Sequence, residues 1–129
     1  MEVRYLGLDV ILVIASATLG IEAGVLATMA DLVTADMAIN APAASFGGSE
    51  FYPDFPTKVG VLGYRLARHH AFPDGNKRIA FLAMVEFVER NGGTWTVHSE
   101  DRTVEMMIAA AAGSVTEAQF IRWVGEEIS

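Results

Sequence analysis

The sequence contains no cysteine, which excludes disulfide-stabilised scaffolds, thiolate metal sites and cysteine nucleophiles. It also lacks a long hydrophobic run. The most apolar stretch near the start spans residues 10–15, whereas a membrane-spanning helix needs about 20 apolar residues. A signal peptide is not indicated either, because Glu2 offsets Arg4 in the region that should be basic. We therefore expect a cytoplasmic protein that does not bind a membrane.

Positive charge is also scarce. The chain has 9 Lys and Arg against 16 Asp and Glu, a net charge of −7, which disfavours direct nucleic-acid binding. This scarce charge is concentrated, however, because residues 58–78 hold five basic residues and only one acid, Asp74. Two of the three histidines, His69 and His70, lie in the same window. A basic window in an acidic chain favours a small anionic ligand over a long polyanion.

The length of 129 residues, 52% of them hydrophobic, predicts a single domain over residues 1–129 with a substantial core. The hydrophobic spacing is mostly helical. We therefore predict an all-α fold of about six helices around a buried central helix. One long connection, residues 40–56, is rich in proline and glycine and is typical of a functional or mobile loop.

Several helices can be placed from local signals. Within residues 59–66 the apolar side chains have helical spacing, and Gly60 and Gly63 allow close packing on one side. The next helix contains the uninterrupted apolar run of residues 79–85, so we expect it in the middle of the bundle. Ser99 is predicted to cap a further helix that ends at Gly113. The last helix is predicted to start at Ser114 or Thr116, since both residues have capping-box spacing.

The most informative segment is residues 69–78, His-His-Ala-Phe-Pro-Asp-Gly-Asn-Lys-Arg. Asp74 is a plausible N-cap, with residues 75–78 forming the first turn of the central helix. Unpaired amides and the positive end of the helix dipole would then form an anion cradle, and Gly75 would let its backbone approach a ligand closely.

The side chains of this segment suit phosphate chemistry. Lys77 and Arg78 can contact phosphate oxygens. Asp74 can hold Mg²⁺ against those oxygens, since Mg²⁺ prefers one or two carboxylates together with phosphates. His70 can act as a general base toward an attacking hydroxyl.

A purely structural interpretation of these residues stays open at this point. Pro-Asp-Gly is an ordinary turn signature, and His69 and His70 can be a surface pair. Lys77 and Arg78 can likewise form a solvated face. No Walker A pattern is present, so the segment is not a P-loop.

The pattern His70-x-Phe72-x-Asp74-Gly75-Asn76-Lys77-Arg78 resembles the signature of the Fic/Doc superfamily, and specifically its Doc (death-on-curing) branch. The likeness extends to Tyr5-Leu6 with Asp9-Val10, to Phe46-Gly47-Gly48 through Tyr52-Pro53, and to Glu89-Arg90-Asn91-Gly92. It therefore covers most of the chain.

This resemblance implies transfer of a phosphorus group from a nucleotide, with ATP and Mg²⁺ as cofactors, to a protein hydroxyl. It implies that His70 is the catalytic base and that Phe72 packs inward. The nucleotide and phosphate positions implied are Arg68, Asp74, Gly75, Asn76, Lys77 and Arg78, with Asp74 also associated with the metal. The flap that aligns a target segment corresponds to Phe46, Gly47, Gly48, Phe51 and Tyr52.

Two departures from AMP-transferring Fic members bear on the reaction. Lys77 replaces the second Gly of their motif, and Phe81 replaces a second Arg. The Lys is typical of the Doc branch and implies a kinase toxin that transfers the terminal phosphoryl of ATP to Ser or Thr. The implied target is elongation factor Tu, whose modification would block translation, and the implied partner is a small Phd-like antitoxin.

Other functions remain open. One alternative is Fic-type transfer of AMP or another nucleotidyl group, and another is a catalytically inactive module that binds an anionic partner. Thr18-x-x-x-Glu22 resembles the inhibitory motif of Fic regulation, although Ala23 follows where Gly or Asn is usual. The alternative for Glu22 is a solvated charge at a helix N-terminus.

Overall fold

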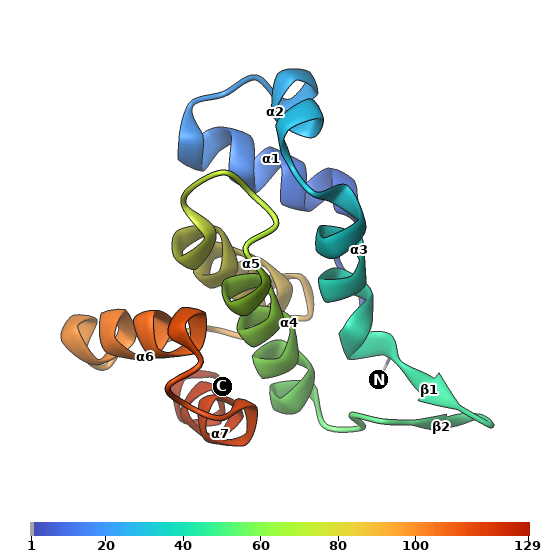
Figure 1. Cartoon of the computed structure of the whole chain (residues 1–129). Helices are drawn as coiled ribbons and strands as arrows, with labels where there is room; N and C mark the ends of the chain where they lie inside the picture. Colours follow the sequence, from blue (N-terminus) through green and yellow to red (C-terminus); the bar gives the residue numbers. More distant parts are fainter. Residues whose placement is uncertain (1) are drawn as a thin grey trace.

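The computed structural model describes residues 2–129, and the predicted all-α class is confirmed (Figure 1). The N-terminal apolar region is divided further than the sequence suggests, because Ala30 and Asp31 separate two helices. Residues 2–129 thus contain seven α-helices where about six were predicted. The elements are α1 (Leu8–Leu19), α2 (Ala23–Met29), α3 (Leu32–Asn40), a 3-10 turn η1 (Ala41–Ala43), β1 (Ser45–Phe46), β2 (Ser49–Glu50), α4 (Phe55–His69), α5 (Asn76–Arg90), α6 (Glu100–Ala112) and α7 (Glu117–Glu127).

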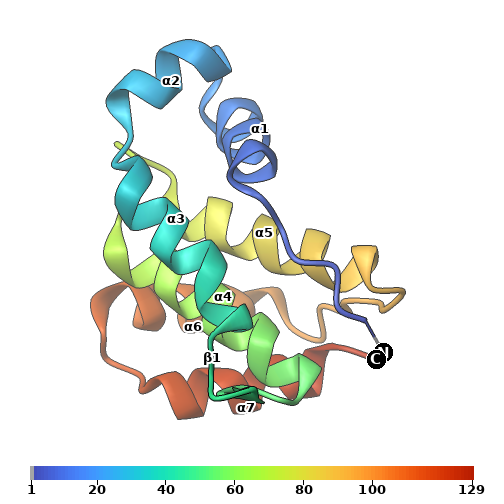
Figure 2. The same ribbon diagram turned by 90° about the vertical axis from the view of Figure 1, so that its right-hand side faces the viewer.

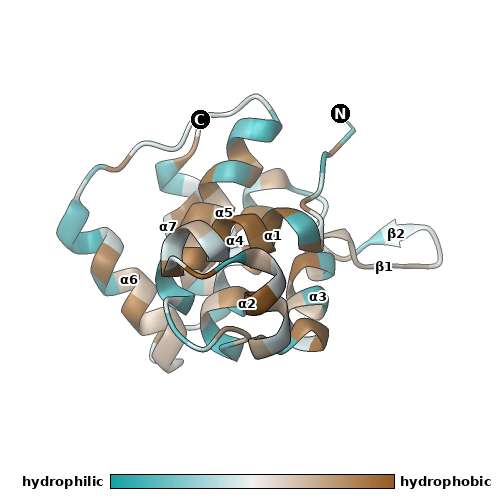
Figure 3. Cartoon of the chain, turned by 90° about the horizontal axis from the view of Figure 1, so that it is seen from above, coloured by the Kyte–Doolittle hydropathy of each residue, from teal (hydrophilic) through white to brown (hydrophobic). Residues whose placement is uncertain are grey.

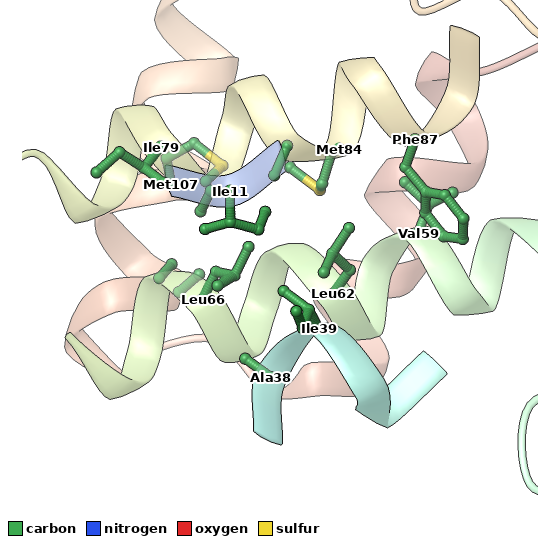
Figure 4. Packing of buried hydrophobic residues seen from close by; sticks show 14 of the residues in the cluster. Ile11, Ala38, Ile39, Val59, Leu62, Leu66, Ile79, Met84, Phe87 and Met107 are labelled. Carbon is green, nitrogen blue, oxygen red and sulfur yellow. The ribbon is translucent and has the colours of Figure 1, made fainter. Parts of the chain in front are cut away.

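Helix α4 occupies the centre of the fold, where the sequence predicted α5. It packs against α3, α5, α6 and α7, and these helices surround it in Figure 2. Figure 4 shows Val59, Leu62 and Leu66 of α4 among side chains from α1, α3 and α5. By contrast, α5 leaves Leu82 39% exposed. A continuous apolar run therefore marks α5 as a core helix without making it the most enclosed one.

Two glycines bring α4 close to two of its neighbours, α7 and α5. A Cβ added to Gly60 would lie 2.6 Å from Ile121 Cγ1 and 2.9 Å from Ile121 Cα, in α7. A Cβ added to Gly63 would overlap the Met84 side chain of α5. Glycine at these positions sets the distance between the central helix and two of its partners.

The boundaries of α6 and α7 follow the capping signals in the sequence. The Ser99 hydroxyl accepts a hydrogen bond from the Arg102 amide at 3.1 Å, and α6 ends at Gly113 in the left-handed conformation. Of the two predicted starts for the last helix, Thr116 is the N-cap, and it forms a complete capping box with Gln119. These predictions are confirmed.

The long connection between α3 and α4 is partly ordered by a hairpin, which projects beyond the helices in Figure 3. Strand β1 pairs with β2 in antiparallel register, with Ser45 opposite Glu50. No single helix within residues 2–129 is long and apolar enough to cross a membrane. Helices α1 and α2 together have the length and composition of a membrane span, but they are bent by 99° relative to each other.

We predict that Gly60→Ala lowers the free energy of unfolding by about 1–3 kcal/mol, because the new methyl meets the Ile121 backbone, which cannot rotate away. Gly63→Ala is expected to cost less, since the flexible Met84 side chain can move. Urea denaturation monitored by circular dichroism measures both values.

Gly125→Ala in α7 is the matched control, because a Cβ there has nothing within 4 Å. This variant should be neutral or more stable by up to about 1 kcal/mol, as expected for Ala over Gly in a helix. Equal stabilities for Gly60→Ala and Gly125→Ala would contradict the close approach of α7.

Candidate functional site

The loop between α4 and α5, yellow-green in Figure 1, forms a pocket of about 550 Å³ together with the end of α1. The pocket brings together most of the predicted site residues. It also includes Thr18 and Leu19, which lie more than fifty positions earlier in the chain, and Leu19 carries no chemical signal that sequence reasoning could have used. The lining residues are Thr18, Leu19, His70, Pro73, Asp74, Gly75, Asn76, Lys77 and Arg78.

The conformation of this loop is held by the side chain of Asn76. Its Oδ1 accepts a hydrogen bond from the Phe72 amide at 3.0 Å, and its Nδ2 donates to the Phe72 carbonyl at 2.8 Å. Phe72 itself is buried, as the resemblance implied, and the Ala71 carbonyl accepts a hydrogen bond from the Asp31 amide at 2.7 Å. The Asn76 side chain is thus used within the loop, which leaves its backbone amide for a ligand.

The N-cap of α5 is Gly75, and the prediction of Asp74 as N-cap is wrong. Gly75 has φ 70°, and the Asp74 carboxylate accepts a hydrogen bond from the Gly75 amide at 2.7 Å. The left-handed turn at Gly75 delays the start of the helix by one residue. A Cβ at Gly75 would also lie 2.9 Å from Leu19 Cδ2, so glycine is needed both for its backbone angle and for the approach of α1.

The first turn of α5 offers free hydrogen-bond donors. No side chain caps this helix in the described part of the chain. The amides of Asn76, Lys77 and Arg78 precede the first intrahelical bond, which runs from Ile79 to the Gly75 carbonyl. Amides at this end of a helix attract anions, and the exposed Lys77 and Arg78 side chains add positive charge.

His70 ends α4 in a strained backbone conformation. Its φ of 51° and ψ of 53° lie in the left-handed region, and it is the one non-glycine residue with positive φ within residues 2–129. An L-residue pays about 1–2 kcal/mol for this geometry. The turn leaves His70 exposed and among the residues that line the pocket, together with the first turn of α5.

The pocket offers few side chains that could hold a metal ion. Residues 2–129 contain no group of three or more His, Cys, Asp or Glu side chains that could hold a metal by themselves. Asp74 is the carboxylate in the pocket, and one of its oxygens is used by the Gly75 amide. A single carboxylate fits Mg²⁺ that is shared with phosphate oxygens, and it does not fit an ion held by protein ligands alone.

Two of the five basic residues in the window of residues 58–78, Lys58 and Arg65, are paired with acidic residues and are therefore not free to bind an anionic ligand. Lys58 is 1% exposed, and its Nζ donates to Glu50 Oε1 at 2.8 Å and to the Pro42 carbonyl at 3.1 Å. Burial works to lower the pKa of Lys58, but its hydrogen bond with Glu50 contributes to a net pKa above the ordinary value. Arg65 pairs with Glu117 at 3.1 Å, and this hydrogen bond raises its pKa.

Arg68 also lies apart from the pocket. It does not line the pocket, and an added Cβ at Gly113 would meet its Nε at 2.7 Å. The guanidinium therefore packs against the C-terminal end of α6, where positive charge is favourable. The cations that line the pocket are Lys77 and Arg78.

The predicted flap residues lie in the hairpin and in the segment that follows β2. The tip contains Gly47 and Gly48, both with positive φ, and Phe46 and Phe51 are 80% and 60% exposed. The outgoing end is fixed by a hydrogen bond of 3.0 Å from Arg65 Nη2 to the Tyr52 hydroxyl. The hairpin therefore combines exposed aromatic side chains with an anchored base.

The two residues of the inhibitory-like pattern have different surroundings. Thr18 lines the pocket, and its hydroxyl donates to the Ile14 carbonyl at 2.8 Å. The Glu22 carboxylate caps α2, accepting hydrogen bonds from the Gly24 and Val25 amides at 2.9 and 3.1 Å. This placement matches the alternative of a solvated charge at a helix N-terminus.

Comparison with known proteins agrees with this site. A model of the Fic/DOC family matches residues 9–88, which is more than half of the chain and includes every residue of the pocket. The chain therefore belongs to the Fic/DOC family. Within that class, it is 42% identical over 57 residues to the protein named Toxin Doc of Mycolicibacterium smegmatis (strain ATCC 700084 / mc(2)155). The match spans 44% of this chain and 44% of that relative, less than half the length of either.

We predict that Asn76→Ala destabilises the fold by about 1–3 kcal/mol, the usual value of two hydrogen bonds to backbone groups, and also weakens phosphate binding. Thermal unfolding measures the first effect and a phosphate titration the second. The second effect arises because the loop that aligns the α5 amides loses its support.

Asn91→Ala is the matched control for this variant. Asn91 makes the same pair of bonds to the Arg4 backbone, at 2.8 and 3.0 Å, far from the pocket in sequence, and its Nδ2 also donates to the Phe87 carbonyl at 2.8 Å. It should lose a similar amount of stability and keep phosphate binding. If both variants lose binding equally, the loss reflects general destabilisation and the role of Asn76 in the pocket is refuted.

We further predict that His70→Gly is about 1 kcal/mol more stable than His70→Ala, because alanine keeps the left-handed strain and glycine relieves it. Guanidinium denaturation of the two variants side by side measures this difference. Equal stabilities would show that His70 is not held in the left-handed conformation in solution.

Proposed function

We propose that this protein transfers the terminal phosphoryl group of ATP to a Ser or Thr hydroxyl of a protein substrate. The observation that carries the proposal is that His70, Asp74, Lys77 and Arg78 line one pocket together with the uncapped N-terminus of α5. Membership in the Fic/DOC family supports a nucleotide as the second substrate.

In the proposed reaction, His70 accepts the proton of the substrate hydroxyl as its oxygen attacks the terminal phosphorus. The new bond joins that oxygen to phosphorus, and the bond from phosphorus to the bridging oxygen breaks, so that ADP leaves with its electron pair. The amides of the first turn of α5, with Lys77 and Arg78, neutralise charge on the phosphate oxygens. Mg²⁺ held by Asp74 would supply further neutralisation.

Lys77 and Phe81 favour transfer of a phosphoryl group over transfer of AMP. A glycine in place of Lys77 would leave more room beside the helix N-terminus, whereas Lys77 fills that space with a cation. Phe81 cannot contact phosphate, and its ring packs edge-on against Trp95 with centroids 5.5 Å apart. The pocket thus holds its positive charge in the first turn of α5.

The hairpin is the proposed contact for the substrate segment. Its exposed Phe46 and Phe51 offer apolar contact, and the short strands leave backbone groups for an extended peptide. Lys58 and Arg65 anchor the hairpin to α4, the helix that ends at His70. A substrate segment on the hairpin would therefore be held at a fixed position relative to the base.

We propose further that the whole of residues 1–129 acts as one Doc-like toxin in the cytoplasm, silenced by a small Phd-like antitoxin and directed at elongation factor Tu. Similarity to Toxin Doc supports the toxin class. Helices α6 and α7 follow the region matched by the family model, and both pack on α4.

We predict that the wild-type protein adds a phosphoryl mass to its target and that His70→Ala lowers the rate by about 10²–10⁴-fold, the usual cost of losing a general base. Lys77→Gly should lose phosphoryl transfer and gain weak AMP transfer, with Phe81→Arg as the second change if one is needed. Intact-mass spectrometry of cell proteins incubated with ATP distinguishes the products.

An adenylyl adduct from the wild type would overturn the kinase assignment. Full activity of a correctly folded His70→Ala protein would overturn the proposed mechanism. His69→Ala serves as the control for the neighbouring imidazole, because His69 does not line the pocket, and this variant should keep most of the activity.

We also predict that co-expression with the product of a neighbouring small gene relieves growth arrest and yields a stable complex. An amphipathic helix in an apolar groove is the expected mode of binding. Size-exclusion chromatography of the co-expressed pair tests the complex, and persistent toxicity without a complex would contradict it.

A further inference from the structure

The guanidinium of Arg65 joins two parts of the chain that are far apart in sequence. Its Nε donates to Glu117 Oε2 at 3.1 Å and its Nη2 to Glu117 Oε1 at 3.5 Å, at the start of α7. The same Nη2 donates to the Tyr52 hydroxyl at 3.0 Å, in the segment between β2 and α4. One side chain of α4 therefore connects α7 to the segment that leaves the hairpin.

The Glu117 carboxylate fixes the orientation of this guanidinium. A guanidinium is planar, and a carboxylate that accepts from both Nε and Nη2 determines its plane. The remaining hydrogen of Nη2 then has one direction, and the Tyr52 hydroxyl accepts it. Arg65 Cζ also lies 6.0 Å from the centre of the Tyr52 ring, a distance at which a cation and a ring attract each other. Without Glu117, the long Arg65 side chain would regain rotamers that do not reach Tyr52.

The position of Glu117 is itself set by its surroundings. Thr116 caps α7 with a complete capping box, and a carboxylate in the first turn is favoured by the helix dipole. The Tyr64 hydroxyl donates to the Val115 carbonyl at 2.8 Å, so the residue next to Arg65 holds the turn that precedes α7. The carboxylate is therefore presented to Arg65 by a backbone that α4 already holds.

The hairpin has other contacts that do not involve α7. Lys58, which is 1% exposed, donates to Glu50 Oε1 in β2 at 2.8 Å. The Phe51 amide donates to the Ala44 carbonyl at 3.0 Å, at the base of the hairpin. These contacts do not depend on Glu117, so its loss would loosen the segment after β2 without releasing the whole hairpin. The expected effect is therefore moderate.

We propose that Glu117 is a positioning residue for the protein substrate, acting on the hairpin through Arg65 and Tyr52. This inference rests on the proposed function, in which the hairpin holds the substrate segment. Glu117 lies outside residues 9–88, the region matched by the family model, so the C-terminal part of the chain would contribute to substrate alignment. Because Glu117 does not line the pocket at His70, it acts on the affinity for the protein substrate and not on the chemical step.

The first test is Glu117→Asp, which keeps the negative charge at the start of α7 but is one methylene group too short to reach both nitrogens of Arg65. With elongation factor Tu as the substrate, KM for that protein should rise about three- to tenfold, the range expected for loss of one hydrogen bond. The values of kcat and of KM for ATP should change by no more than about twofold. Steady-state kinetics with each substrate varied in turn measures all three values.

Limited proteolysis with chymotrypsin gives a readout that needs no substrate. Chymotrypsin cleaves after aromatic residues, and Phe46 and Phe51 in the hairpin are 80% and 60% exposed. Glu117→Asp should be cleaved there about three- to tenfold faster than the wild type, because a looser segment opens more often. Mass spectrometry of the fragments locates the cut, and thermal unfolding checks that the fold is kept.

Tyr52→Phe tests whether the effect passes through the Tyr52 hydroxyl. This variant removes only the hydroxyl, so Glu117→Asp should add nothing further to KM or to the cleavage rate in that background. Glu86→Asp is the matched control, because Glu86 pairs with Arg90 at 2.8 Å and has a comparable exposure on α5. The control should leave KM and the cleavage rate unchanged.

Two results would overturn the inference. If Glu117→Asp is cleaved at the wild-type rate, Arg65 holds Tyr52 without help from Glu117. If the effects of Glu117→Asp and Tyr52→Phe on KM are additive, Glu117 acts by another route, such as direct contact with the substrate. If the wild type modifies no protein while Glu117→Asp is still cleaved faster, the proposed function fails and the hold of Glu117 on the hairpin is supported.

Discussion

The buried position of α4 is the constraint on which the rest of the molecule depends. Its glycines allow α5 and α7 to approach closely, and its Lys58 and Arg65 side chains form the hydrogen bonds that hold the hairpin. The same helix ends at His69, directly before His70, so the base of the hairpin and the imidazole are both attached to one helix. A change that tilts α4 would move both together and would alter their relation to α5, which carries the anion-binding amides.

The loop between α4 and α5 converts this packing into a site. Asn76 closes it from within, Asp31 holds it from α3, and Leu19 covers Gly75 from α1. The first two contacts are hydrogen bonds to the backbone of Phe72 and Ala71, and the third depends on the absence of a side chain at Gly75. The amides of α5 are therefore aligned before any ligand arrives, which reduces the reorganisation needed when charge develops on phosphate oxygens.

Much of this arrangement could be predicted from the sequence, because its signals are local. The caps at Ser99 and Thr116 lie within four residues of their partners, and the residues around the motif are contiguous. The all-α class followed from helical spacing. By contrast, the central position of α4 was not predictable from hydropathy, because Lys58 looks like a surface residue until Glu50 and the Pro42 carbonyl are seen to pair with it.

The same distinction explains the errors at the site. The net charge of residues 58–78 is local information, but its partners Glu50 and Glu117 lie outside that window. The N-cap assignment failed by one residue because Asp74 and Gly75 are both good N-cap residues, and only the backbone angle at Gly75 decides between them.

The backbone at His70 has a consequence for the evolution of this chain. At that turn, glycine would be the more stable choice, and most random substitutions elsewhere lower stability. A lineage released from selection for activity would therefore tend to fix glycine there early, as compensation for other losses. Descendants with a glycine at this turn, and with the Asn76 contacts intact, would be folded proteins whose catalytic role had lapsed.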